Sequence, residues 1–176
     1  ENVRYGSLNG GGPGLGELCA AADLNALLPR LPEGMQTSLG ESGGLVSGGE
    51  GQRVRLARAL GRDQARLVIL DEPFRGLDRV QRAALLERAR VHWRGATLLY
   101  VTHRIAETRT FERVLVLREG RLVEDGVPVE LERDERSHLR ALLEEERACE
   151  ASWEDPSWRR LELEDGNLKE HEPCAH

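Results

Sequence analysis

Lysine is almost absent from this sequence of 176 residues. Of its 25 basic residues, 24 are arginine and the only lysine is Lys169. A phosphate-binding loop with the pattern Gly-x-x-x-x-Gly-Lys-Ser/Thr needs a lysine beside its backbone N–H groups to hold nucleotide phosphates. Lys169 follows Asn167 and Leu168 instead of such a glycine pattern. We therefore expect that this stretch of chain contains no phosphate-binding loop.

Long apolar runs and paired cysteines are missing as well. No stretch approaches the roughly 20 consecutive apolar residues that a membrane-spanning helix needs, and residues 1–30 lack the order of a secretion signal. The three cysteines, at positions 19, 149 and 174, are far apart and form no Cys-x-x-Cys pair of the kind that binds zinc. These absences favour a soluble chain in a reducing, cytoplasmic setting.

The negative charge is concentrated near the C-terminus. The whole sequence has a net charge of −6, but residues 130–176 hold fifteen acidic against seven basic residues, a net of −8. The first 129 residues therefore carry about +2, and no basic stripe dominates them. This distribution gives no reason to expect a nucleic-acid partner.

Hydrophobic periodicity predicts an α/β fold. The continuous apolar run over residues 67–70 is typical of a strand buried on both faces in the middle of a parallel sheet. From about residue 129 the pattern loses strands and becomes helical and acidic, and residues 153–176 are expected to be weakly ordered. The predicted helices cover residues 18–28, 47–61 and 78–93, and the predicted strands cover residues 67–70, 97–102, 114–117 and 121–123.

A serine and two glycines open the second predicted helix. Ser47 as N-cap and Glu50 three positions later form the pattern of a capping box, which alone implies only a helix start. Gly48 and Gly49 add a second meaning, because they leave the N–H groups at the positive helix end accessible to a phosphate. The pattern therefore predicts an anion-binding helix end.

Two adjacent acids follow the first buried strand. Asp71 and Glu72 stand at its carboxyl end, where parallel α/β sheets place ligand-binding residues. In phosphoryl-transfer sites one carboxylate helps to hold Mg²⁺ and another orients or deprotonates the attacking water. A solvated strand end is the alternative reading for the pair in isolation.

Two further polar residues have both a structural and a functional interpretation. Asp78 can act as the N-cap of the third helix, with Gln81 completing a capping box. His103 ends the second buried strand, and a lone histidine at a strand end is usually structural. Their positions relative to the other motifs decide the functional interpretation.

Taken together, these motifs resemble the back half of an ATP-binding cassette (ABC) ATPase. The run Val46-Ser47-Gly48-Gly49-Glu50-Gly51-Gln52-Arg53-Val54-Arg55-Leu56-Ala57-Arg58-Ala59-Leu60 resembles the signature motif and its helix. Residues 67–72 resemble the Walker B motif, residues 76–78 the D-loop, and His103 the switch histidine. The resemblance covers about residues 1–131.

The resemblance implies a role for each residue. Ser47, Gly48, Gly49, Glu50 and Asp78 would face an ATP held by a second nucleotide-binding domain. Asp71 would serve Mg²⁺, Glu72 would be the catalytic base, and His103 would contact the γ-phosphate. Departures from the family pattern are Glu50 for glutamine, Gly51 for a larger polar residue and Arg75 for a small residue. Because the capping box can hold the Glu50 carboxylate away from phosphate, we expect Glu50→Gln to leave ATP turnover equal or better.

The implied fold is an incomplete P-loop NTPase. Residues 1–62 would form part of the helical signature subdomain, residues 63–131 the C-terminal half of the parallel-sheet core, and residues 132–176 an acidic tail. Residues 1–6 resemble the stretch that follows the glutamine loop in exporters, and neither that loop nor the phosphate loop is present. We expect a longer gene product, with a naturally degenerate module as the alternative.

The implied function is ATP-driven membrane transport. Residues 31–43 resemble the segment that contacts the membrane domains of exporters, although Ser38 replaces their usual glutamate. This resemblance favours export over import, at the cytoplasmic face of the cell membrane, with membrane domains in the same or a separate chain. The dimer partner would be an identical or a different nucleotide-binding domain. The alternatives are a DNA- or ribosome-associated ABC ATPase and a non-enzymatic module that completes a partner's nucleotide site.

Overall fold

The computed structural model describes residue 3 and residues 13–39, 46–62, 64–153, 160–164 and 167–171. The chain forms two compact units, unit 1 from Glu1 to Val101 and unit 2 from Thr102 to His176. The division at residues 62 and 131 that the sequence predicts concerns functional subdomains and stays a prediction. Of the predicted exporter-like stretches, residues 1, 2, 4–6 and 40–43 lie outside the described ranges.

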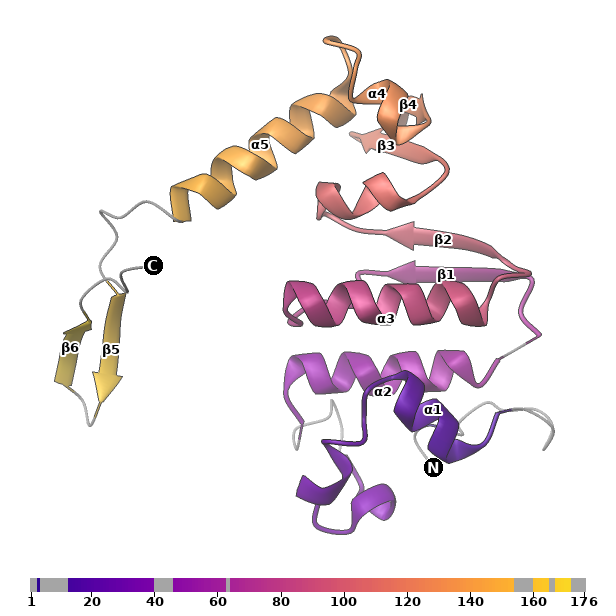
Figure 1. The fold of residues 1–176 in the computed structure, drawn as a ribbon, viewed down its shortest axis with the longest axis vertical. Coiled ribbons are helices and arrows are strands. Elements are labelled where there is room, and N and C mark those ends of the chain that lie inside the picture. The colour runs from indigo at the N-terminus through magenta and orange to yellow at the C-terminus, as the bar shows by residue number, and fades with distance from the viewer. Residues whose placement is uncertain are drawn as a thin grey trace. The chain divides into compact units, whose positions relative to one another are not determined.

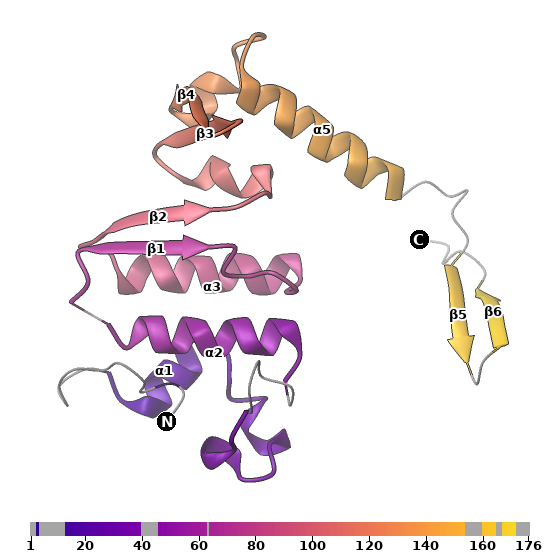
Figure 2. The ribbon, with the colours of Figure 1, turned by 180° about the vertical axis from the view of Figure 1, so that it is seen from behind.

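Unit 1 combines a parallel strand pair with helices. Strands β1 and β2 pair in parallel, with Leu67 opposite Thr97 and Asp71 opposite Val101. Figures 1 and 2 show the strand pair, α3, α2 and α1 following one another across the unit. The elements are α1 (Leu15–Ala21), η1 (Leu28–Arg30), η2 (Gly34–Gln36), α2 (Gly48–Leu60), β1 (Leu67–Asp71), α3 (Arg79–His92) and β2 (Thr97–Val101).

The core of unit 1 lies where the apolar faces of these helices and of β1 meet. Helix α2 buries Val54, Ala57 and Leu60, which are spaced as one face of a helix, and these positions match the sequence pattern. Leu85 of α3 is only 1% exposed. The helical and strand positions predicted for residues 47–61, 67–70, 78–93 and 97–102 are therefore confirmed to within two residues at each end.

The first predicted helix is wrong in extent. The structure ends α1 at Ala21 and places only the short 3₁₀ turn η1 at Leu28–Arg30, instead of one helix over residues 18–28. Asp23 has a φ of +58°, a left-handed conformation that stops a right-handed helix. Leu24 and Leu27 are nevertheless buried. The apolar spacing therefore predicted the buried positions correctly and the length of the helix incorrectly.

The sheet of unit 1 is buried on one face only, which corrects the prediction of a strand covered on both faces. Along β1, Val68 and Leu70 are buried at 7% exposure each, whereas Leu67 and Ile69 are 58% and 59% exposed. On β2, Leu99 and Val101 are exposed as well. A continuous apolar run predicts a strand that is covered on both faces. The described residues of unit 1 cover only one face of this strand.

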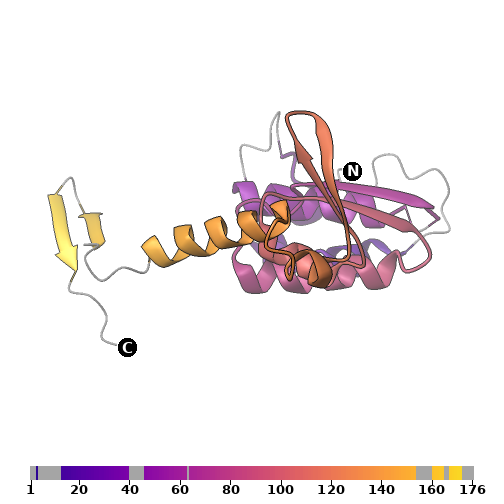
Figure 3. The ribbon, with the colours of Figure 1, turned by 90° about the horizontal axis from the view of Figure 1, so that it is seen from above.

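Unit 2 contains an antiparallel hairpin and a long helix. Strands β3 (Val114–Arg118) and β4 (Arg121–Gly126) lie side by side around the turn at Glu119 and Gly120 (Figure 3). The hairpin confirms the predicted strand pair. Val114 and Val116 pack with Leu139 and Leu143 in the core of this unit. The other elements are η4 (Ile105–Thr110), α4 (Pro128–Leu131) and α5 (His138–Trp153).

The acidic tail contains strands that the sequence analysis did not predict. Strand β5 (Arg160–Glu164) pairs antiparallel with β6 (Asn167–His171). Leu161 and Leu163 alternate with Arg160, Glu162 and Glu164, the period-two pattern of a strand, and the sequence Asp-Gly separates the two runs. The high charge of the tail favoured the prediction of weak order over residues 153–176, and this short alternation was not used. No helix in the described part of the chain is long and apolar enough to cross a membrane.

Candidate functional site

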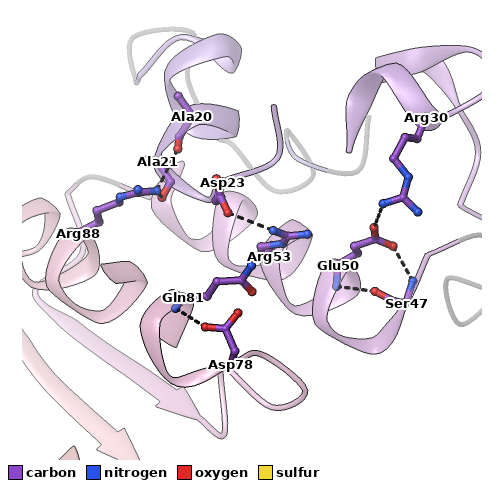
Figure 4. A network of polar contacts seen from close by, with 10 residues as sticks. All are labelled: Ala20, Ala21, Asp23, Arg30, Ser47, Glu50, Arg53, Asp78, Gln81 and Arg88. Carbon is purple, nitrogen blue, oxygen red and sulfur yellow. Dashed lines mark hydrogen bonds and ion pairs between the residues drawn. The ribbon is translucent and has the colours of Figure 1, made fainter. Parts of the chain in front are cut away.

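The N-terminus of α2 is closed by its own side chains. The Ser47 hydroxyl accepts a hydrogen bond from the Glu50 N–H at 3.3 Å, and the Ser47 N–H donates to Glu50 Oε2 at 2.8 Å. This reciprocal pair, drawn in Figure 4, is the capping box that the sequence predicts. It fixes the direction in which the chain enters the helix, and with it the position of the first helical N–H groups.

Glu50 is buried and ionised at this helix end. Its second carboxylate oxygen, Oε1, accepts a hydrogen bond from Arg30 Nη1 at 2.8 Å. The Ser47 backbone N–H is the largest cause that lowers the pKa of Glu50, and Arg30 adds to it. Both carboxylate oxygens are therefore engaged, one by the Ser47 N–H, as the capping-box interpretation predicts, and the other by Arg30.

The two glycines of the motif stand in different surroundings. A Cβ placed on Gly48 would meet no heavy atom within 4 Å, and this residue is exposed. A Cβ on Gly49 would come within 2.7 Å of Leu77 Cδ2 and 3.1 Å of the Gly76 carbonyl oxygen. Gly48 thus leaves the helix end open to a ligand, whereas Gly49 allows α2 to approach the turn after β1.

Asp71 and Glu72 stand at the carboxyl end of β1, as the sequence predicts. Asp71 is exposed, and the Glu72 N–H continues the sheet by donating to the Val101 carbonyl at 3.0 Å. Glu72 has a φ of +45°, a left-handed conformation that costs a residue with a Cβ on the order of 1 kcal/mol. Such strain is concentrated at functional sites, and here it turns the chain sharply after the strand.

The turn after β1 connects the two acids to α3. Phe74 is buried and contacts the Tyr100 ring at a centroid distance of 6.1 Å, and Gly76 has a φ of +82°. The Asp78 carboxylate then accepts a hydrogen bond from the Gln81 N–H at 2.9 Å, which confirms Asp78 as the N-cap of α3 (Figure 4). Packing at Gly49 and Gly76 brings this turn against the α2 end within unit 1.

His103 belongs to unit 2. It is the second residue after the end of β2, and its side chain is exposed. The next residue along the chain, Arg104, donates its N–H to the Thr102 hydroxyl at 3.0 Å. The structure therefore places the predicted switch histidine at the surface of its unit, at the end of the second strand, as expected from the sequence.

The donor groups fit a nucleotide phosphate at the α2 end and, separately, a Mg²⁺ ion at the end of β1. The first N–H groups of an α-helix have no carbonyl partner within the helix, so the N–H of Gly48 is available to an anion. Within the described ranges, no group of three or more His, Cys, Asp or Glu side chains could hold a metal ion. Mg²⁺ at nucleotide sites uses one or two carboxylates and completes its shell with phosphate oxygens and water, which the single exposed Asp71 carboxylate suits.

Arg30, Gly76 and Leu77 shape this site in ways that sequence reasoning missed. Arg30 pairs with Glu50 across twenty positions of sequence, and no local pattern reports such a contact. Gly76 was noted only as part of a motif, and its left-handed φ is the reason for a glycine there. Leu77 is buried against Gly49, a contact that only the tertiary structure shows.

Known proteins with similar sequences are ABC transporters. The chain is 33% identical to "ABC transporter ATM1" of Toxoplasma gondii over 81% of its own length. It is 42% identical to "Mycobactin import ATP-binding/permease protein IrtB" of Mycobacterium tuberculosis over 62% of its length. It is 40% identical to the "ATP-dependent lipid A-core flippase" of Pseudomonas putida over 74% of its length. No family model matches the chain.

A solved structure supports the same relationship. A bacterial Atm1-family ABC exporter with ATP bound matches 83% of this chain with a TM-score of 0.74 and 28% sequence identity. The chain spans only 25% of that exporter and 13%, 19% and 22% of the three sequence relatives. The mixed α/β structure therefore matches one part of a much longer transporter.

Proposed function

Because this chain is a homologue of ABC exporters, we propose that it forms part of the ATP-binding and ATP-hydrolysing domain of such a transporter. The complete domain would couple ATP hydrolysis, in a dimer that holds nucleotide between its two halves, to substrate translocation. The relatives include proteins named for import and for lipid transfer, so the transported substrate is not part of the proposal.

The α2 end carries this proposal. Ser47 and Glu50 fix the helix start, Gly48 leaves an open approach to the first N–H groups, and the Glu50 carboxylate is bonded to Ser47 and Arg30. A helix end built in this way suits a phosphate that arrives from outside the chain. Ser47, Gly48 and Gly49 would therefore meet an ATP bound by a second nucleotide-binding domain, with Glu50 and Asp78 supporting that surface.

The chemistry proposed for Asp71, Glu72 and His103 concerns a second ATP. Asp71 would take part in the Mg²⁺ shell, and Glu72 would accept a proton from the attacking water. The left-handed backbone of Glu72 supports this assignment, because strained backbone conformations are concentrated at functional sites. His103 would donate to the γ-phosphate. These residues would act on a nucleotide that a phosphate-binding loop holds. The chain's only lysine, Lys169, does not belong to such a loop.

The exposed sheet face supports an incomplete P-loop NTPase core. Alternate apolar residues on both strands of unit 1 are open to solvent, an arrangement that is costly unless further structure covers it. We propose that the remaining part of the nucleotide-binding domain covers this face and supplies the phosphate-binding loop. In that domain, residues 1–62 would be signature subdomain, residues 63–131 sheet core and residues 132–176 tail. The exposed residues are Leu67, Ile69, Leu99 and Val101.

The proposed partners follow from this incompleteness. A second nucleotide-binding domain would complete each ATP site, and membrane-spanning domains would carry the substrate. The chain would then work at the cytoplasmic face of the cell membrane. Residues 1–176 alone should not hydrolyse ATP, and ATP turnover by this isolated chain that is lost in Glu72→Gln would contradict the proposal.

The test is ATP turnover by the full-length protein in lipid vesicles. Glu72→Gln should lower kcat by about 100-fold or more, because a general base contributes about 10² to 10⁴ to the rate. Ser47→Ala should lower turnover as well, through a weaker grip on the partner's nucleotide. Glu87→Gln, an exposed acid on α3, and Ser152→Ala on α5 are the matched controls and should leave turnover unchanged. Unaltered turnover in both Glu72→Gln and Ser47→Ala would refute the proposed function.

A further inference from the structure

An arginine outside every recognised motif neutralises the acid in the signature helix. Arg30, at the end of η1, donates from Nη1 to Glu50 Oε1 at 2.8 Å, and Glu50 Oε2 accepts the Ser47 N–H at the same distance (Figure 4). Both carboxylate oxygens are therefore engaged on the side of the helix that faces η1. The Glu50 side chain is 9% exposed and the Arg30 side chain is 72% exposed.

The electrostatics of a helix end explain why this pairing matters. A carboxylate in the first turn stabilises the helix, but it also opposes the approach of a second anion to the same N–H groups. The Ser47 N–H and Arg30 both lower the pKa of Glu50, so the carboxylate remains charged at neutral pH. Its negative charge at the α2 end must therefore be balanced by a cation, and the Arg30 guanidinium is placed to balance it.

A second ion pair attaches the same segment to α2. Arg53 Nη1, one turn further along the helix, pairs with Asp23 Oδ2 at 3.1 Å. Glu50 and Arg53 are three positions apart, so they present neighbouring contacts to the segment from Asp23 to Arg30. The segment contributes Asp23 and Arg30, and α2 contributes their oppositely charged partners Arg53 and Glu50. The two ion pairs together hold the segment against α2 and keep Arg30 beside Glu50.

We propose that Arg30 is a positioning residue for the nucleotide site at the α2 end. It holds the Glu50 carboxylate against Ser47 and cancels its charge, so that the Gly48 N–H can donate to a phosphate oxygen of an ATP bound by the partner domain. This inference rests on the proposed function and deepens it. Arg30 contacts no nucleotide in this role, since it acts through Glu50.

The experiment is a double-mutant cycle in the full-length protein in lipid vesicles, read as the KM for ATP and kcat at low ionic strength. Arg30→Ala should raise the KM for ATP about three- to tenfold, the range expected for an uncompensated charge at a helix end, with a smaller effect on kcat. Glu50→Gln removes the charge that Arg30 balances while its amide keeps the capping bond, so the KM of this single variant is the reference for the double variant. Glu50→Gln should also restore KM in the Arg30→Ala protein, and Arg30→Lys should retain most of the wild-type affinity.

The controls separate charge from folding. Arg140 forms a comparable ion pair with Glu144 at 2.9 Å on α5, so Arg140→Ala removes an arginine without touching the site. The effect of Arg30→Ala should shrink at 0.5 M salt, because salt screens exposed charges. If Arg30 served packing alone, Glu50→Gln would not rescue the Arg30→Ala protein. If the Arg30→Ala protein does not fold, Arg30→Gln replaces it in the cycle.

Each outcome decides between the two proposals. Rescue by Glu50→Gln, with Ser47→Ala still harmful, supports both. An unchanged KM in Arg30→Ala, or a raised KM without rescue, overturns the role of Arg30 and leaves the proposed function standing if Ser47→Ala still lowers turnover. If Ser47→Ala leaves turnover unchanged, the nucleotide role of the α2 end is overturned, and the role of Arg30 with it. If Glu72→Gln leaves turnover unchanged as well, the proposed function is also overturned.

Discussion

The N-terminus of α2 and the sheet that carries Asp71 lie in the same unit, but the chain completes them to different degrees. At the α2 end, Ser47, Glu50 and Arg30 pair with one another, and Gly49 packs against the turn after β1. On the sheet, alternate residues such as Ile69 remain exposed on one face. The α2 end is built from local and nearby groups, whereas the described residues leave apolar side chains of the sheet exposed.

This difference matches the two roles proposed for the chain. A surface that meets a partner's nucleotide must be finished within its own chain before the partner arrives. A sheet that holds the domain's own nucleotide belongs to a core, and a core is finished only when all of its strands and helices are present. Four experiments test this contrast, in order of decreasing expected effect.

The largest effect should distinguish the two faces of β1. Leu70→Ala should lower the free energy of unfolding of residues 1–176 by about 2–5 kcal/mol, because it leaves a cavity in the core. Ile69→Ala should cost less than about 0.5 kcal/mol in the same chain, since its side chain is already 59% exposed. Urea unfolding measures both. In the full-length protein the cost of Ile69→Ala should rise toward that of Leu70→Ala, and a constant small cost would show that nothing covers this face.

The next effect should separate the two glycines of α2. Gly49→Ala should destabilise the chain by about 1–3 kcal/mol, because the new Cβ overlaps Leu77 and the Gly76 carbonyl. Gly48→Ala should be neutral to within about 0.5 kcal/mol, since a Cβ there meets no neighbour. Thermal unfolding of the purified chain compares them. Equal destabilisation by the two substitutions would mean that the close contact between α2 and the turn does not form.

A smaller effect should follow from removing the cap of α3. Asp78→Ala should cost about 1 kcal/mol of unfolding free energy, because the Gln81 N–H loses its acceptor. Asp78→Asn keeps an oxygen at the same place and should cost only a few tenths of this. Urea unfolding at neutral pH checks the pair. Identical losses for alanine and asparagine would indicate that Asp78 acts through its charge.

The smallest effect should appear in the pH dependence of the α2 end. The pKa of Glu50 is lowered from its ordinary value of 4.5, so the folded state favours the charged carboxylate. Its contribution is fully present above the unfolded pKa and is lost as the pH falls through the lower, folded pKa. The stability gap between wild type and Glu50→Gln, up to about 1 kcal/mol at pH 7, should therefore narrow as the pH falls below the unfolded pKa of 4.5. Unfolding curves from pH 7 to pH 3 measure it, and a constant gap would contradict the assignment.

Much of the local structure of unit 1 could be predicted from the sequence. The helical period and the cap residues Ser47 and Asp78 located α2 and α3, and the short apolar runs located β1 and β2. These signals depend on neighbours within one or two turns, which is why they can be read locally. The helix predicted over residues 18–28 failed because a single residue, Asp23, takes a left-handed conformation that no periodicity reveals.

The candidate site was predictable in its residues and not in its surroundings. The residues Ser47, Gly48, Asp71 and Glu72 form recognisable runs of sequence. The pairing of Arg30 with Glu50 joins residues twenty positions apart. A local sequence pattern does not show which distant residues will come into contact. The strained φ of Glu72 likewise depends on how the chain turns after β1.

By itself the sequence determined the positions of the main helices and strands of unit 1, the cap residues and the polar groups at the strand and helix ends, because each of these depends on short-range periodicity and hydrogen bonding. Only the tertiary structure decided that Gly49 serves packing while Gly48 leaves the helix end open, and that Arg30 balances Glu50. It also showed that the described residues of unit 1 leave Leu67, Ile69, Leu99 and Val101 of β1 and β2 exposed. Burial and charge balance are set by groups distant in sequence, and folding is what brings them together.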